Sequence, residues 1–275
     1  NIREQLEILE QYTPEKILIQ DPIFGVDFTW FKKILDTIGT KRNYKVKLET
    51  HVDILNEQRK NFLIKNDIDL TIGFETASRQ MLHLMDKTKD PSKYLERMKC
   101  IMEDFGENSQ ELTINVLLGH PGESLRTIDE TFEFLTRNLS FTEGLITKFS
   151  IFRLYPGTNV YVNRGFFENA FKSRFFFADW WYNELDYSIV PSLIEPSNGL
   201  TFYSEMKYIN EKINELFHST IFSDEQVSNA YKLFYLRFLS NINKTYRNLE
   251  QDLINYEACM GNINKLEKPN LVSNF

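Results

Sequence analysis

Cysteine is almost absent from this sequence: only Cys100 and Cys259 occur among 275 residues. The two lie far apart, and neither belongs to a C-x-x-C or C-x-x-x-C pair, so a disulfide framework of the secreted kind is not expected. This chain alone also lacks the thiolates that hold an iron–sulfur cluster of the usual kind. We therefore expect a reduced, cytoplasmic setting.

Long apolar runs are missing too. No stretch reaches the length of a membrane-spanning helix, and no signal peptide is recognisable, so no membrane partner is expected. The net charge of −7 argues against a dedicated nucleic-acid-binding protein, which usually shows a basic face. No cluster of His, Asp and Glu has metal-ligand spacing, so no metal-binding residue is predicted.

What the sequence does contain is an alternation of amphipathic helices and apolar strands through about residue 155. Five strands are predicted, each preceded by a helix, and this pattern indicates an α/β fold with a helix-covered parallel sheet and right-handed crossovers. An open doubly wound sheet and a barrel, complete or partial, both fit the pattern. The chain opens with a helix at Asn1 rather than with Met, and we expect a fragment or processed chain that has lost its first strand. The predicted strands are 17–20, 44–48, 69–74, 112–118 and 146–154.

The pattern changes after Pro156-Gly157, and we predict a division into residues 1–160 and a mainly helical region at 161–275. Ten aromatic residues crowd the stretch 165–187. They form either a lid or core, or the wall of a substrate-binding or cobalamin-facing cavity. Helices are predicted near 203–217 and from Ser223, which with Gln226 resembles a capping box.

Sites in parallel α/β proteins lie at the carboxyl ends of the strands. The residues that follow the five predicted strands are polar, Gly or Pro, and any one of these segments alone fits a helix cap or a turn. The five segments are Asp21-Pro22-Ile23-Phe24, Glu49-Thr50-His51, Gly73-Phe74-Glu75-Thr76-Ala77-Ser78, Gly119-His120-Pro121-Gly122-Glu123-Ser124 and Arg153-Leu154-Tyr155-Pro156-Gly157-Thr158.

Taken in order, these segments resemble the radical S-adenosylmethionine (radical SAM) enzymes, in particular the branch that often carries a cobalamin-binding domain. Gly73-Phe74-Glu75-Thr76 followed by Met85-Asp86-Lys87 is similar to that branch's fourth strand and loop. Leu118-Gly119-His120-Pro121-Gly122-Glu123 is similar to the fifth, Tyr155-Pro156-Gly157-Thr158 to the sixth, and Asp21-Pro22-Ile23-Phe24 to the second. The resemblance covers about residues 1–160.

The resemblance implies a partial (β/α)₆ barrel lacking its first strand. It also implies S-adenosylmethionine and a [4Fe-4S] cluster that together form a 5′-deoxyadenosyl radical, with a flavodoxin or ferredoxin as reductant and cobalamin in some members. The C-x-x-x-C-x-x-C loop that would hold the cluster is expected just before Asn1, so this chain alone is not expected to generate the radical. The substrate would be a small molecule or a peptide.

The resemblance also implies which residues bind the cofactor. Glu75 would accept hydrogen bonds from ribose hydroxyls or the methionine ammonium. Glycines in the fifth-strand loop would let the backbone approach the adenine closely. Each of these residues also has a purely structural explanation as a cap, turn or packing residue. The full set of predicted cofactor-binding residues is Asp21, Thr50, Gly73, Glu75, Ser78, Gly119, Pro121, Gly122, Glu123, Arg153, Pro156 and Gly157.

Two other functions stay open at the level of sequence. One is a conventional (β/α) barrel lyase or hydrolase that uses Glu75, Glu123 and His51. The other is a non-catalytic, degenerate barrel that binds a nucleoside or a peptide. His51 and His120 are single histidines of the kind that is more often structural than catalytic.

Overall fold

The computed structural model describes residues 2–21, 24–39, 42–108, 110–138, 144–175, 194–200 and 202–217. Its centre is a five-stranded sheet in which every strand is parallel to its neighbours and the strands lie side by side in sequence order. This confirms the predicted α/β class with a parallel sheet. The strands are β1 (Lys16–Ile19), β2 (Lys45–His51), β3 (Ile68–Glu75), β4 (Leu112–Leu118) and β5 (Leu145–Ile151).

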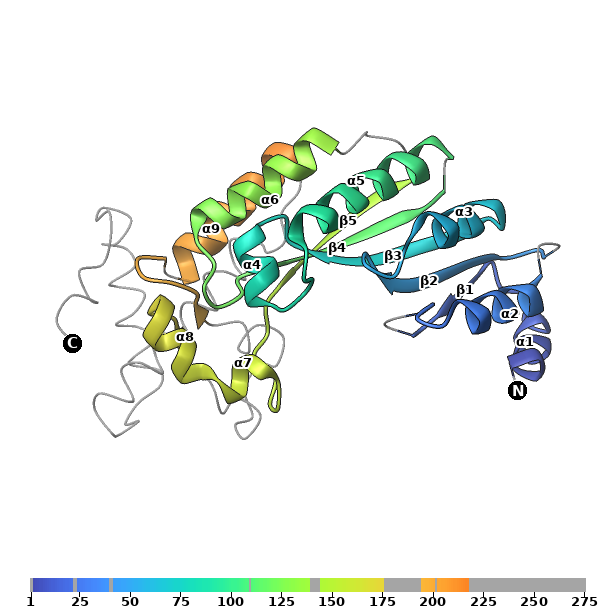
Figure 1. Ribbon diagram of the computed structural model, residues 1–275, viewed down its shortest axis with the longest axis horizontal. Coiled ribbons are helices and arrows are strands. Elements are labelled where there is room, and N and C mark those ends of the chain that lie inside the picture. The colour runs from blue at the N-terminus through green and yellow to red at the C-terminus, as the bar shows by residue number, and fades with distance from the viewer. Residues whose placement is uncertain are drawn as a thin grey trace, which may run out of the picture.

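A helix precedes each strand, as the sequence predicts. Figure 1 shows α5 and α6 side by side along the sheet, with α9 beside α6. A short antiparallel pair, β6 (Arg174–Phe175) and β7 (Ile194–Glu195), lies apart from the main sheet. The helices are α1 (Ile2–Glu10), α2 (Phe28–Ile38), α3 (Glu57–Lys65), α4 (Arg79–Leu84), α5 (Pro91–Glu107), α6 (Leu125–Asn138), α7 (Asn159–Val162), α8 (Arg164–Phe171) and α9 (Phe202–Phe217).

One face of the sheet is apolar and covered by the helices. Side chains alternate between the two faces along a strand, and the register places Ile17 beside Val46 and Leu48 beside Leu70, which in turn lies beside Leu112. All five of these side chains are buried. Parallel strands in sequence order, joined by right-handed crossovers, place their connecting helices on one side of the sheet.

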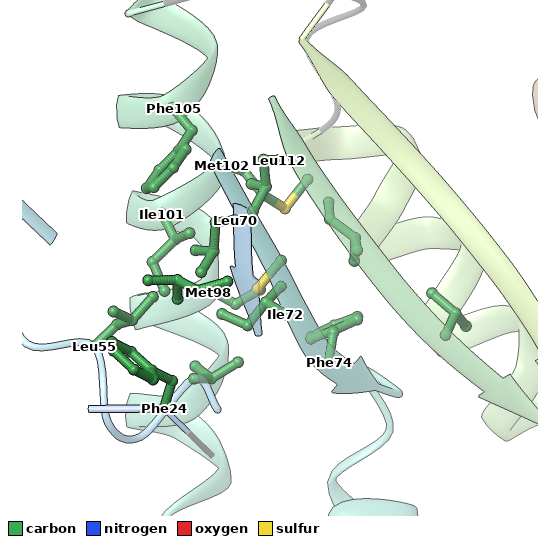
Figure 2. Close-up of a cluster of buried hydrophobic side chains, with 14 of the residues drawn as sticks. Phe24, Leu55, Leu70, Ile72, Phe74, Met98, Ile101, Met102, Phe105 and Leu112 are labelled. Atoms are coloured by element: carbon green, nitrogen blue, oxygen red, sulfur yellow. The ribbon is translucent and has the colours of Figure 1, made fainter. Parts of the chain in front are cut away.

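Helix α5 supplies much of the cover on this face. Figure 2 shows Met98, Ile101 and Met102 of α5 facing Leu70 and Ile72 of β3. Each of these five side chains is fully buried. At about 25 cal/mol per Å² of apolar area removed from water, such contacts supply most of the driving force for this layer.

Local signals explain where the helices begin. The Asp27 side chain accepts hydrogen bonds from the backbone N–H groups of Thr29 and Trp30, and so caps α2. Asp90 caps α5, in which Pro91 occupies the first turn. The predicted end of α5 was wrong by two residues: Gly106 is buried inside the helix, and Asn108 caps it.

The region beyond β5 is only partly described. A second apolar cluster, which includes Leu154, Val160, Phe167 and Ile194, joins α7 and α8 to β7. Helix α9 confirms the predicted helix near 203–217, and its Ile209 and Ile213 belong to the main core. The predicted helix from Ser223 and the aromatic residues at 176–187 lie outside the described residues.

No described helix is both long enough and apolar enough to cross a membrane. The division into 1–160 and 161–275 stays a prediction.

Candidate functional site

The face of the sheet opposite the helices is mainly polar, although Leu18, Leu117 and Ile146 share it. We call it the polar face and define it by Lys16 of β1, Lys47 of β2, Asp69 of β3, and Thr113 and Asn115 of β4, together with Lys148 of β5. Each of these residues is offset by one position from the apolar residues of its strand. This distinguishes the sheet from a parallel sheet covered by helices on both faces, whose strands are apolar throughout.

Ion pairs link the strands at the amino-terminal part of the polar face. Lys16 Nζ lies 2.7 Å from Glu111 and 3.1 Å from Asp69. Lys47 reaches across β3 to pair with Glu111 and to donate a 2.6 Å hydrogen bond to Thr113 Oγ1. Hydrogen bonds from Lys16 and Lys47 lower the pKa of Glu111 to about 2. These charged groups pair with one another, so we assign this part of the face a structural role.

Glu75 ends β3 in an uncommon backbone conformation. Its φ is +68°, in the left-handed region, and the Thr76 N–H donates to Phe74 O at 2.9 Å, which makes Glu75 the centre of a tight γ-turn. The register with β4 shifts between Gly73 and Glu75. Strained residues of this kind cluster at functional sites and cost about 1–3 kcal/mol each. The turn therefore marks Glu75 as a candidate functional residue.

Lys87 pairs with Glu75. Its Nζ donates to Glu75 Oε1 at 2.9 Å, whereas no hydrogen bond to Oε2 is formed within the described residues. The pair lies over Gly73, where an added Cβ would come within 3.0 Å of Glu75 Oε1 and 3.3 Å of Lys87 Nζ. A side chain at Gly73 would displace the pair. Glycine is thus needed at position 73 because a larger side chain would collide with this pair, and not because the backbone has a positive φ.

Two rings support this turn from β2 and α5. The Tyr94 hydroxyl bonds Phe74 O at 2.8 Å and Gly73 O at 3.1 Å, and burial raises its pKa well above the usual range. His51 Nδ1 accepts a hydrogen bond from the Asp53 N–H at 3.1 Å, and the ring also bonds the Lys87 backbone. Burial, and then the charge of Lys87, lowers the pKa of His51, so the ring is neutral near pH 7. These contacts give His51 a structural task.

The loop after β4 is closed by a buried carboxyl. Glu123 is fully buried and its Oε2 accepts a hydrogen bond from the Gly119 N–H, while Oε1 has no hydrogen-bond partner among the described residues. Burial raises the pKa of Glu123 to about 8. Glu205 of α9 is buried as well, with its Oε1 3.3 Å from the position of a Gly119 Cβ. Burial, and then the charge of Glu123, raises the pKa of Glu205 well above the usual range.

The rest of this loop is packed rather than open. An added Cβ at Gly122 would meet Leu84 of α4 at 2.5 Å and Phe171 of α8 at 3.4 Å, and the Gly122 N–H donates to Pro196 O at 2.7 Å. His120 Nδ1 bonds Pro121 O at 2.8 Å, and burial lowers the pKa of the ring to about 4. The contacts of Gly122 in the structure are therefore with the protein, and its approach to an adenine stays a prediction.

Three further predicted residues lie around β1, β2 and β3. Thr50 is buried and donates a 2.6 Å hydrogen bond to Phe24 O, which fixes the segment after β1 against β2. Ser78 is the N-cap of α4 and is fully buried, and its hydroxyl has no hydrogen-bond partner within the part of the chain that the structure describes. Asp21 is half-buried beyond the end of β1. Pro22 and Ile23 of the same segment lie outside the described residues.

The segment after β5 forms a turn. The Thr158 N–H donates to Tyr155 O at 3.3 Å, Pro156 occupies the second position of the turn, and Gly157 has a φ of +79°. These are the features of a type II β-turn, which fully accounts for the Pro-Gly pair. Arg153 is exposed between β5 and this turn.

The strand ends bring the predicted residues to a common edge. Gly73 and Glu75, Gly119, and Arg153 lie at or just after the carboxyl ends of the adjacent strands β3, β4 and β5. Thr50 differs from them, because its register position places it on the helix-covered face with Leu48. Two surface cavities, of about 570 and 470 Å³, lie elsewhere, between α1 and α2 and around α6.

Sequence reasoning missed Lys87 as a binding residue, and it missed Asn115, Lys148 and Glu205 altogether. Asn115 and Lys148 interrupt apolar strands at positions that face away from the helices, and this was the available signal. Glu205 gave no signal, because its position depends on how α9 packs against α6.

The described residues do not fit an iron–sulfur cluster. Cys100, the described cysteine, is half-buried on α5, and Cys259 lies outside the described part of the chain. Within the described ranges, no three His, Cys, Asp or Glu residues come close enough together to bind a metal ion.

Comparisons with known proteins assign no family to this chain. No family model and no curated protein matches the chain. Among solved structures, a match is found to the archaeal Elp3 of Methanocaldococcus infernus with residues 1–46 deleted, at 18% identity and a TM-score of 0.42. The match covers 60% of this chain and 44% of that one, and at this level of similarity no function is inferred from it.

Proposed function

We propose that this chain is the S-adenosylmethionine-binding part of a radical SAM enzyme, folded as a partial (β/α)₆ barrel. The motif order from Gly73 to Thr158 supports the assignment. The architecture is compatible with it, since parallel strands in sequence order with helices on one face are the arrangement from which a barrel is built. A doubly wound sheet differs, because its strand order reverses.

The conformation of Glu75 carries the proposal. A carboxylate is held in a strained turn at the carboxyl end of a strand, above a glycine, with Oε2 free of hydrogen bonds in the described structure. Such an oxygen can accept from ribose hydroxyls or from an ammonium group. Lys87 fixes the orientation of the carboxylate by holding Oε1.

The proposal assigns cofactor binding to this chain and no radical step. The cluster would supply the electron for cleavage of the cofactor, and the described residues offer no ligand set for it. Cobalamin and a flavodoxin- or ferredoxin-type reductant enter the proposal through the family resemblance alone.

Glu75→Gln tests the assignment. We expect S-adenosylhomocysteine, measured by isothermal titration calorimetry, to bind this variant at least about tenfold more weakly than the wild type. Loss of a charge-assisted hydrogen bond costs about 1.5–3 kcal/mol, and 1.4 kcal/mol corresponds to tenfold.

Glu133→Gln is the matched control, because Glu133 is an exposed glutamate of α6 paired with Arg137. The Glu133→Gln variant should bind S-adenosylhomocysteine with the same affinity as the wild type. Equal affinity of the wild type and Glu75→Gln, or no binding of S-adenosylhomocysteine to the folded wild type, would refute the assignment and favour a barrel that does not use this cofactor.

A further inference from the structure

Lys148 differs from the other lysines of the polar face. Lys16 is bound to Asp69 and Glu111, and Lys47 is bound to Glu111. Lys87, which lies beside this face, is bound to Glu75. Lys148 forms no ion pair with any described residue and is exposed. A cation without a carboxylate, on a face where the neighbouring cations have one, is available to a ligand.

The strand register places an amide beside this lysine. Asn115 of β4 is the register partner of Lys148 of β5, so the two backbones lie about 4.8 Å apart and both residues occupy the polar face. Burial alternates along β5 so that Ile146, Lys148 and Ser150 are exposed, whereas Phe149 stacks on Phe132 of α6. The exposed row therefore faces away from the helices.

These groups share one chemistry. The Lys148 ammonium, the Asn115 amide N–H₂ and the Ser150 hydroxyl can all donate hydrogen bonds, and together they suit an oxyanion. The carboxylates of this face lie on the other strands. Glu75 is bound to Lys87, Asp69 and Glu111 are bound to lysines, and Glu49 is on β2, three strands away.

We propose that Lys148 and Asn115 form a subsite for an oxyanion, a carboxylate or a phosphate, carried by the substrate. The inference rests on the proposed function, in which Glu75 binds the cofactor two strands away on the same face. At about 4.8 Å per strand, the two subsites are separated by roughly 10 Å across the sheet, which allows two ligands to lie side by side.

The test uses the chain with lysine ε-carbons labelled with ¹³C, titrated with inorganic phosphate and with sodium acetate at constant ionic strength. The Lys148 resonance, identified by its loss in Lys148→Met, should shift and reach saturation. The Lys99 resonance should not, because Lys99 lies on the exposed side of α5 near Glu103. Asn115→Ala should weaken the apparent affinity by about three- to tenfold, the effect of one hydrogen bond.

A second arm separates a substrate anion from the cofactor's own carboxylate. S-adenosylhomocysteine carries that carboxylate, and 5′-methylthioadenosine is the same nucleoside without it. If neither displaces phosphate from Lys148, and Lys148→Met binds both like the wild type, the subsite belongs to the substrate. Displacement by S-adenosylhomocysteine alone would overturn the proposal.

Other outcomes are equally decisive. A Lys148 resonance that does not saturate, together with aggregation of Lys148→Met, would overturn the subsite and show that the lysine protects a sheet edge from pairing with other strands. Saturation by phosphate in a chain that binds neither nucleoside would support the anion subsite while refuting the proposed cofactor.

Discussion

Glu123 and Glu205 show how burial dominates the protonation of single residues. Both carboxyl groups are enclosed where the loop after β4 meets α9, and each has one oxygen without a hydrogen bond within the described residues. Neither has a basic partner there. The neutral, protonated form is therefore favoured in the folded protein.

Substitution of Glu123 by Gln should increase stability at neutral pH. The folded-state pKa is about 8 and the usual value is 4.5, so the folded state holds a proton that the unfolded state releases. Stability should then fall as pH rises from about 4.5 to 8 and level off above. Glu123→Gln removes this dependence and should raise the free energy of unfolding at pH 7.5 by on the order of 2–4 kcal/mol.

Urea unfolding at pH 5, 6.5 and 8 measures this effect. The difference between Glu123→Gln and the wild type should grow across the three pH values. A difference that is constant with pH would show that Glu123 is ionised in the folded protein.

Residue-scale prediction from sequence succeeded where a strand end specifies a position. The motif placed Glu75 and Gly73 at the carboxyl end of β3, where they lie. It could not give the reason for Gly73, because the space that the glycine leaves is filled by the pair of Glu75 with Lys87, which is fourteen residues further along the chain. The approach of Gly122 to an adenine stays a prediction, and in the structure Leu84 and Phe171 lie where its side chain would be.

At the scale of elements, the ion pairs of the polar face join four strands. Glu111, just before β4, holds Lys16 of β1 and Lys47 of β2, and Lys16 also holds Asp69 of β3. The Glu111 side chain is 29% exposed, so solvent screens the pairs only in part.

Glu111→Gln should destabilise the sheet at neutral pH by about 1–3 kcal/mol, because Lys47 loses its carboxylate partner and Lys16 keeps only Asp69. The folded-state pKa of about 2 lies below the usual 4.5, so the contribution is fully present above pH 4.5 and is lost as pH falls toward 2. The stability difference between the variant and the wild type should therefore shrink in acid.

Thermal melts followed by circular dichroism from pH 7 to pH 3 measure this difference. Glu133→Gln, which breaks an exposed pair within α6, should change the melting temperature little at any pH. An equal loss of stability in both variants would contradict a special role for the Glu111 pairs.

Element bounds were well predicted for several helices and strands with a periodic apolar pattern, whereas β5 ends three residues before its predicted end. Strand β4 matches its predicted range, and β2, β3 and α9 lie close to theirs. The end of α5 was missed because Gly106, a common stop signal, is buried against the core, and packing outweighed its intrinsic preference.

Across the whole molecule, stability should be graded along the sheet. The central strands β3 and β4 each have two strand neighbours and fully buried apolar residues, whereas β1 has four residues and pairs only with β2 among the described strands. Backbone opening requires less free energy where fewer buried contacts are broken.

Hydrogen–deuterium exchange should therefore be slowest in peptides from β3 and β4 and fastest, within the described sheet, in β1. Protection of β1 equal to that of β4 would indicate that a further strand or another chain covers its outer edge.

The order of the strands is the feature of the whole molecule that sequence did not determine. Apolar periodicity shows which residues face the helices, but a doubly wound sheet and a barrel use the same alternation of elements. The choice depends on long-range pairing between strands, which no local pattern encodes. The structure shows that the five strands lie side by side in the order in which they occur in the sequence.

The Tyr94 hydroxyl connects the two sides of the sheet. Tyr94 belongs to α5, on the helix-covered side, yet it binds the carbonyl oxygens of the two residues that precede Glu75. A residue on the helix-covered side of the sheet thus holds the γ-turn at Glu75 in shape. A substitution in the hydrophobic layer can therefore alter affinity on the opposite face without touching any residue that meets a ligand, and random mutagenesis for altered binding should return positions in α5 as well as at the strand ends.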